Sequence, residues 1–171
     1  MLSTTIIIPC FNEADAIEQT VRQIIETLSF ECDRTWEVIV VDDGSTDESK
    51  ERLRTLSQKQ QQAPLRVVMH SRNLGYGAAL KSGIQRSRSE LICITDADGT
   101  YPNDRIPELL RLAEERDMVV GARIGQDVKY SKIRSIPKMV LVPWVSFLCG
   151  SHVPDMNSGL RVFRRDAAMR Y

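Results

Sequence analysis

The chain has 171 residues, of which 42% are hydrophobic and 27% charged, which is ordinary for a single soluble globular domain with a real core. Lysine plus arginine and aspartate plus glutamate both total 23, so the charge balance excludes the basic excess typical of a nucleic-acid partner. Four scattered cysteines without metal-ligand spacing indicate reduced thiols in a cytoplasmic protein. We expect no signal peptide, because residues 1–8 lead directly into a strand, and no apolar run approaches the roughly 18 residues of a membrane span.

Strand-like and helix-like segments alternate along the chain. Residues 4–9 form an apolar, β-branched run, and apolar residues recur at helical spacing over about 16–28. The alternation continues with strands and helices that we expect at 36–41, 46–62, 65–70, 74–87, 90–95, 104–115 and 117–122. Residues 163–171 read as the first turn of a helix, so we expect a domain truncated at its C-terminus.

Local patterns refine three of these elements. Asn12 is a candidate cap for the first helix, and Ser45 with Glu48 has the spacing of a capping box for the second. The helix expected at 74–87 is rich in small residues, which suits close packing on a sheet. His70 and His152 are single histidines with no partner in the pattern, and we interpret both as structural.

Strands that alternate with helices predict an α/β sandwich with a mainly parallel central sheet. Right-handed crossovers place the loop after every strand along one edge, where open α/β sheets bind ligands. That edge would collect the polar segments 9–13, 42–47, 71–77, 96–102 and 121–123.

Five carboxylates belong to this edge: Glu13, Asp42, Asp43, Asp96 and Asp98. Such crowding costs free energy through like-charge repulsion unless cations balance it. For Asp96 and Asp98, a hard cation such as Mg²⁺ or Mn²⁺ that bridges diphosphate oxygens is the natural role. Turn formation and helix capping remain the alternative role for these acids.

The segment "DADGT", residues 96–100, also matches the nucleophile motif of haloacid-dehalogenase-type phosphatases, in which Asp96 would attack a phosphoryl group. That motif usually ends the first strand of its fold, whereas about three strand–helix units precede it here. A third hypothesis is a non-catalytic module that only binds a nucleotide sugar. The position of the motif argues against the phosphatase.

Six segments in order resemble the family 2 glycosyltransferases, above all the dolichol-phosphate mannosyltransferase and polyprenyl-phosphate glycosyltransferase group. They are "IIIPCFNEADAI", "VIVVDDGSTDES", "NLGYGAALKSGI", "TDADGTYP", "VVGAR" and "DMNSGLRVFRR". The resemblance implies the GT-A fold, a Rossmann-like α/β/α sandwich, as a single catalytic domain over residues 1–171. Its nucleotide-sugar-binding half would cover about 1–123 and its acceptor half about 124–171.

The resemblance also implies roles for individual residues. Those expected to bind the nucleotide sugar are Pro9, Phe11, Glu13, Asp42, Asp43, Asp96, Ala97 and Asp98. Those expected at the metal are Asp96, Asp98 and Thr100, where Thr100 replaces the glutamine usual in the mannosyltransferases. Those expected to act in catalysis are Asp98, Arg123, Arg134 and Asp155, with the arginines at phosphate groups and Asp155 as a base or as an orienter of an arginine.

The implied reaction is transfer of a hexose, with inversion, from a GDP-mannose-like or UDP-glucose-like donor to a polyprenyl or dolichyl phosphate. A phosphate acceptor needs cations but no general base, and the region after residue 123 supplies Lys129, Lys132, Arg134 and Lys138. Residues 139–149, apolar and with one tryptophan, suit a peripheral contact with a membrane interface. We therefore expect a cytoplasmic location at the cytoplasmic face of a membrane.

Overall fold

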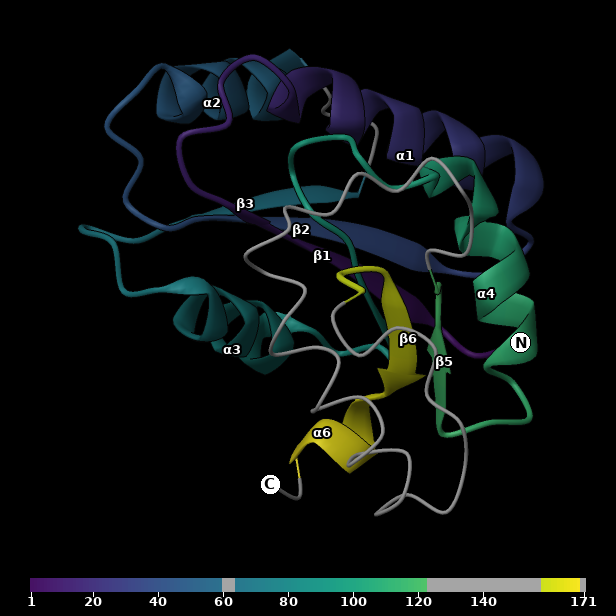
Figure 1. The fold of residues 1–171 in the computed structure, drawn as a ribbon. Coiled ribbons are helices and arrows are strands. Elements are labelled where there is room, and N and C mark those ends of the chain that lie inside the picture. The colour runs from purple at the N-terminus through teal and green to yellow at the C-terminus, as the bar shows by residue number, and fades with distance from the viewer. Residues whose placement is uncertain (60–63, 123–157, 170–171) are drawn as a thin grey trace, which may run out of the picture. The chain divides into compact units, whose positions relative to one another are not determined.

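The computed structural model describes residues 1–59, 64–122 and 158–169 (Figure 1). All five predicted strands and all four predicted helices are confirmed, with shifts of a few residues at their ends. The strands are β1 Thr4–Cys10, β2 Trp36–Asp42, β3 Leu65–Met69, β4 Leu91–Ile94, β5 Met118–Val120 and β6 Arg161–Arg164. The helices are α1 Ile17–Glu31, α2 Ser49–Lys59, α3 Tyr76–Arg86, the 3₁₀ turn η1 Asn103–Arg105, α4 Ile106–Leu112 and α6 Arg165–Met169.

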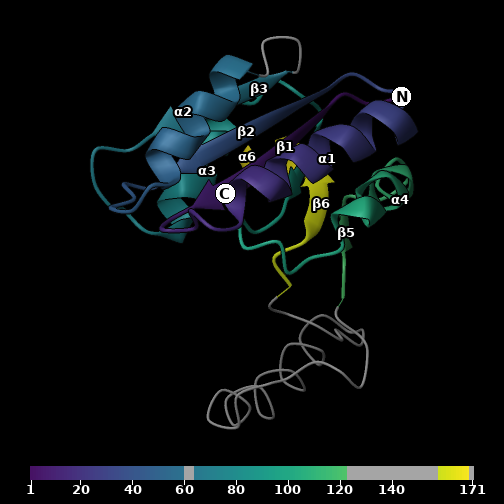
Figure 2. The same cartoon turned by 90° about the horizontal axis from the view of Figure 1, so that it is seen from above.

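The described strands form one six-stranded sheet in the order β3-β2-β1-β4-β6-β5. β1 runs parallel to β2 and β4, and β2 runs parallel to β3. β6 lies between β4 and β5 and is antiparallel to both, so β5 runs in the same direction as β4. Figure 2 shows β6, in yellow, beside β5. The prediction of a mainly parallel sheet is confirmed, but β6 was not predicted.

Helices cover both faces of the sheet, with α1, α2 and α4 on one side and α3 on the other (Figure 1). Alternation along β1 explains this arrangement, because successive side chains point to opposite faces. Ile6 and Ile8 pack with residues of α1, α2 and α4, whereas Ile7 packs with Leu80 and Ile84 of α3. A Cβ atom on Gly83 of α3 would lie 2.6 Å from Ile7 Cγ2, so the expected close packing of this helix is confirmed.

The C-terminal prediction was partly wrong. Residues 163 and 164 continue β6, and the short helix α6 begins only at Arg165. Compactness divides the chain into one unit of residues 1–120 with 159–171 and a second unit of residues 121–158. The first unit thus includes the last residues of the chain, and the expected division into a nucleotide-sugar-binding half and an acceptor half stays a prediction. No helix within the described ranges has both the length and the apolar character needed to cross a bilayer.

Candidate active site

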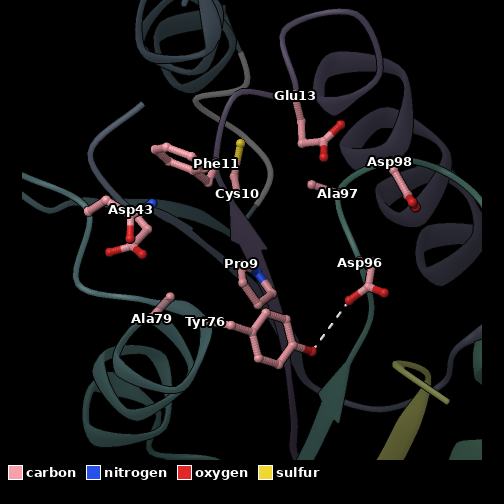
Figure 3. Close-up of a pocket in the computed structure, with 11 residues that line it drawn as sticks. Pro9, Cys10, Phe11, Glu13, Asp43, Tyr76, Ala79, Asp96, Ala97 and Asp98 are labelled. Atoms are coloured by element: carbon pink, nitrogen blue, oxygen red, sulfur yellow. Dashed lines mark hydrogen bonds between the residues drawn. The ribbon is translucent and has the colours of Figure 1, made fainter. Parts of the chain in front are cut away.

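The carboxyl ends of β1 and β4 and the beginning of α3 surround a cavity of about 350 Å³ (Figure 3). Its lining residues are Pro9, Cys10, Phe11, Glu13, Asp43, Asn73, Tyr76, Ala79, Asp96, Ala97 and Asp98. Seven of the eight residues predicted to bind a nucleotide sugar are therefore brought together. Its size and mixed lining suit a small polar ligand with an apolar part.

Asp42 is the predicted pocket residue that does not line the cavity. It is fully buried at the end of β2, where its Oδ2 accepts a hydrogen bond of 3.3 Å from the Ser45 amide. Its Oδ1 has no hydrogen-bond partner among the described residues. The neighbouring acid, Asp43, lines the cavity instead.

Three carboxylates, Glu13, Asp96 and Asp98, gather at one side of the cavity (Figure 3). The pKa of Glu13 is raised by its partial burial and by the negative charges of Asp98, Asp47 and Asp96. A raised carboxyl pKa means that the ionised form is disfavoured until positive charge arrives. The three carboxylates therefore make this side of the cavity electrostatically unfavourable for a further negative charge and favourable for a positive one.

The protein supplies only part of a metal-ligand shell. Among the described residues, no three histidine, cysteine or acidic side chains form a group that could hold a metal ion by themselves. Mg²⁺ sites that work on nucleotides use one or two carboxylates and complete the shell with water and phosphate oxygens. Asp96 and Asp98 fit a cation of that kind, which would be bound together with a diphosphate.

Thr100 holds the carboxylate of Asp98. Asp98 Oδ1 accepts hydrogen bonds from the Thr100 amide at 3.0 Å and from its hydroxyl at 2.8 Å. Gly99, between them, has a φ of +69°, a left-handed conformation that favours glycine. In the described geometry the Thr100 hydroxyl thus orients a proposed metal ligand, and its prediction as a direct ligand stays a prediction.

Asp96 has a neighbour on each of two sides. The Tyr76 hydroxyl donates a hydrogen bond of 3.3 Å to Asp96 Oδ1, which joins α3 to the end of β4 (Figure 3). Burial and the charge of Asp96 raise the pKa of Tyr76 to about 12, so the hydroxyl remains a donor. On the other side, the backbone of Gly159 approaches the Asp96 carboxylate, and its amide donates to the Tyr101 hydroxyl at 2.5 Å.

We expect Gly159→Ala to weaken metal-dependent nucleotide binding roughly tenfold with little loss of stability, since one displaced ligand costs about 1–2 kcal/mol. An added Cβ would lie 2.5 Å from Asp96 Oδ2 and 2.8 Å from its Cγ, so the side chain must turn away. Isothermal titration with UDP or GDP and Mn²⁺, beside a urea unfolding curve, measures both effects. Unchanged binding would contradict the close approach of residue 159 to Asp96.

Asp43 is the centre of a hydrogen-bond network at the opposite wall. Its Oδ1 accepts from His70 Nδ1 at 2.6 Å and from the Leu74 amide at 3.0 Å, and its Oδ2 accepts from the Gly75 amide at 2.8 Å. Burial works against ionisation, but these hydrogen bonds outweigh it and lower the pKa of Asp43. The interpretation of His70 as a residue without partners was wrong; His152 lies outside the described residues.

Two loops at the rim are tied together through their side chains. Ser45 Oγ accepts from the Asn12 amide, Asn12 Oδ1 accepts from the Thr46 amide, and Asp47 Oδ2 accepts from the Ala14 amide. The predicted caps were wrong for this reason, because Asn12 and Ser45 bond across the loops. Asp47, instead, accepts from the Ser49 amide where α2 begins.

The other predicted catalytic residues belong to the segment after residue 122. Arg123, Arg134 and Asp155 lie outside the described residues, as does the expected membrane segment 139–149. The sequence reasoning also missed Asn73, Tyr76 and Gly159 as parts of the site. All three lie within segments that carry the family resemblance. The spacing of residues in those segments does not show whether a given residue packs within the fold or lies at the cavity.

Solved structures define the class of fold. A mannosyltransferase from Pyrobaculum calidifontis, in complex with GDP-Man and Mn²⁺, superimposes with a TM-score of 0.69 and 23% identity, over 99% of this chain and 46% of that one. Glucosyl-3-phosphoglycerate synthase from Mycobacterium tuberculosis, in complex with Mn²⁺, UDP and glucosyl-3-phosphoglycerate, also gives 0.69, at 22% identity over 96% and 57% of the two chains. The predicted GT-A fold is confirmed.

The chain belongs to glycosyl transferase family 2, whose model matches residues 5–171. Undecaprenyl-phosphate 4-deoxy-4-formamido-L-arabinose transferase of Pseudomonas aeruginosa is 32% identical over 94% of this chain and 47% of its own length. Dolichyl-phosphate beta-glucosyltransferase of Trichomonas vaginalis is 31% identical over 96% of this chain and 52% of its own. The chain thus spans about half the length of these curated relatives, and the predicted resemblance to the polyprenyl-phosphate group is confirmed.

Proposed function

We propose that this chain is the donor-binding part of a glycosyltransferase that moves a hexose, with inversion, from a nucleotide diphosphate sugar to a polyprenyl or dolichyl phosphate. The observation that carries the proposal is the gathering of Glu13, Asp96 and Asp98 beside a cavity at the carboxyl edge of a parallel sheet. The printed names of the relatives, which describe transfer to undecaprenyl and dolichyl phosphates, support the acceptor class.

Each wall of the cavity has a part in this reaction. Pro9 and Phe11 offer an apolar surface to the nucleoside, and Asp96 and Asp98 would hold Mg²⁺ or Mn²⁺ with the donor diphosphate. When bound, such a cation stabilises the negative charge that builds on the leaving diphosphate. Thr100 keeps Asp98 oriented, and Tyr76 does so for Asp96, so both carboxylates are positioned before the donor arrives.

The acceptor side of the proposal rests on charge. A phosphate acceptor is already anionic near neutral pH, so it needs positive charge beside the donor and no general base. We propose Arg123 and Arg134 for contacts with the phosphates and Asp155 for orienting an arginine. Residues 139–149 would then contact the cytoplasmic face of the membrane that holds the lipid acceptor.

The phosphatase alternative finds no support. Asp96 follows the fourth strand in chain order, and its carboxylate accepts a hydrogen bond from Tyr76. The mannosyltransferase structure and the curated undecaprenyl-phosphate and dolichyl-phosphate relatives are named as sugar transferases. Hydrolysis of p-nitrophenyl phosphate that is lost in Asp96→Asn would revive the phosphatase.

A thermal-shift panel tests the donor. We expect a UDP- or GDP-sugar, at about 100 times its dissociation constant with Mn²⁺, to stabilise the chain by about 2.7 kcal/mol, which raises Tm by roughly 5–10 °C. Addition of EDTA should remove most of this shift, and free mannose or glucose should give none. No shift with any of the UDP-, GDP- and dTDP-sugars would defeat the proposal.

Turnover separates an enzyme from a binding module. A chain extended to the full length of the relatives should transfer sugar to undecaprenyl or dolichyl phosphate in the presence of the donor that gives the shift. Nucleotide affinity without turnover in that longer chain would favour the non-catalytic module. Transfer to simple sugar hydroxyls alone would move Asp155 into the role of a general base.

A further inference from the structure

The His70 imidazole connects three elements at the cavity wall. Its Nδ1 lies 2.6 Å from Asp43 Oδ1, beyond the end of β2, and its Nε2 lies 2.9 Å from Ser82 Oγ on α3. Its own backbone amide donates to the Asp42 carbonyl at 2.9 Å, which extends the pairing of β3 with β2. The His70 and Asp43 side chains are only 9% and 5% exposed, so water competes little for these bonds.

The proton positions on the ring follow from its partners. An ionised carboxylate only accepts hydrogen bonds, so Nδ1 carries a proton and donates it to Asp43. The Ser82 hydroxyl can donate to Nε2 or accept from it, and it fixes the ring from the side of α3 in either case. The bond to Asp43 is charge-assisted, which makes it stronger than a bond between neutral groups.

The loop between β3 and α3 depends on Asp43 for its conformation. Residues 71–74 are exposed, so side-chain packing does little to hold them. The amides of Leu74 and Gly75 both donate to Asp43, and Gly75 has a φ of +95°. This anchored turn is followed directly by Tyr76 and preceded by Asn73, and both side chains line the cavity.

We infer that His70 is a positioning residue of the donor pocket, which through Asp43 fixes the turn that presents Asn73 and Tyr76 to the nucleotide sugar. This inference rests on the proposed function for the identity of the ligand. His70 itself does not line the cavity, so it acts through Asp43 and the turn rather than by touching the donor. Both ring nitrogens of His70 have partners within the protein. We therefore expect His70 to affect the affinity for the donor more than the rate of sugar transfer.

Three variants separate positioning from general stability. His70→Ala removes both ring contacts, whereas His70→Asn keeps a donor in the place of Nδ1. Arg34→Ala is the matched control, because Arg34 is 4% exposed, pairs with Glu114 at 3.0 Å and lies before β2, at the opposite edge of the sheet. Removal of this buried guanidinium group should destabilise the protein without reaching the cavity.

Two readouts are needed, namely hydrogen exchange at the Leu74 and Gly75 amides and titration with UDP and with GDP in the presence of Mn²⁺. We expect His70→Ala to speed exchange at both amides and to raise the nucleotide dissociation constant about tenfold. That change corresponds to about 1.4 kcal/mol, the size of one hydrogen bond between the displaced turn and the nucleotide. His70→Asn should recover most of both effects, and Arg34→Ala should change neither.

The possible failures are distinct. If the wild-type chain binds neither nucleotide, the proposed function fails, while the exchange data still test whether His70 fixes the turn. Normal exchange at Leu74 and Gly75 in His70→Ala would overturn the inference, as would normal nucleotide binding with fast exchange. If His70→Ala and Arg34→Ala weakened nucleotide binding equally, His70 would only stabilise the fold in general, and the inference would fail.

Discussion

Asp98→Asn is expected to weaken Mn²⁺-dependent nucleotide binding, and sugar transfer in a longer chain, by roughly 100-fold or more, which is typical for loss of one electrostatic group at such a site. In the wild-type chain the Thr100 hydroxyl donates to Asp98 Oδ1 at 2.8 Å. Asparagine has the same shape as aspartate, and its side-chain oxygen can still accept this hydrogen bond. The substitution removes the negative charge that a hard cation needs. Isothermal titration with UDP and GDP, with Mn²⁺ or with EDTA, measures the loss.

The control for this variant is Asp104→Asn. Asp104 lies in η1, a few residues after Asp98. Its side chain is 61% exposed, and its one partner among the described ion pairs is Arg105, at 3.7 Å. Its change should leave nucleotide binding within about twofold, because exposed pairs contribute little. Asp47 would be a poor control, since it holds the Ala14 amide beside Glu13. Similar affinities for the Asp98 and Asp104 variants would remove Asp98 from the metal site.

Of the variants proposed for this protein, Gly44→Ala should lower the free energy of unfolding most, by about 3 kcal/mol or more. Gly44 has a φ of +74°, and an added Cβ would lie 2.2 Å from the Arg72 carbonyl carbon and 2.5 Å from the Asn73 amide nitrogen. Both are backbone atoms, so the loop at 71–75 must move as a whole, and the anchor at Asp43 moves with it. Urea unfolding measures the change in free energy.

Gly77→Ala is the matched control for the effect of a methyl group on glycine. A Cβ on Gly77 meets nothing within 4 Å, and the residue lies within α3. Alanine there should be neutral or stabilising by up to about 1 kcal/mol, because it lowers the entropy of the unfolded chain and favours a helix. A Gly44 variant as stable as wild type would show that the two loops are not in close contact.

Much of the fold could be predicted because local patterns and the global architecture agree. The β-branched runs at residues 4–9 and 36–41 could only be buried strands, and the crossover rule then placed the acids at one edge. The strand β6 could not be predicted from its sequence, because it is only four residues long and two of them, Arg161 and Arg164, are charged. Its antiparallel place between β4 and β5 depends on contacts that no local pattern encodes.

The site was harder to predict at the level of single atoms. Sequence reasoning placed Asp42 and Asp43 together but could not decide which one faces the cavity, since adjacent residues differ only in the direction of the side chain. His70 has no local partner, because its bonds reach residues 27 positions before and 12 positions after it. Tyr76 does begin α3, but its helical position does not reveal that its hydroxyl reaches Asp96, 20 positions later in the chain.

The place of β6 has a consequence for synthesis on the ribosome. Val120 pairs with Arg161, so β5 has no described partner strand until about 40 further residues have been made, which takes roughly 2–8 s at usual elongation rates. During that interval β4 also presents an open hydrogen-bonding edge next to the buried Ile92. A nascent chain halted after β5 has left the ribosome and before β6 has done so would expose an unpaired strand edge, so recruitment of a chaperone is expected to peak at those chain lengths.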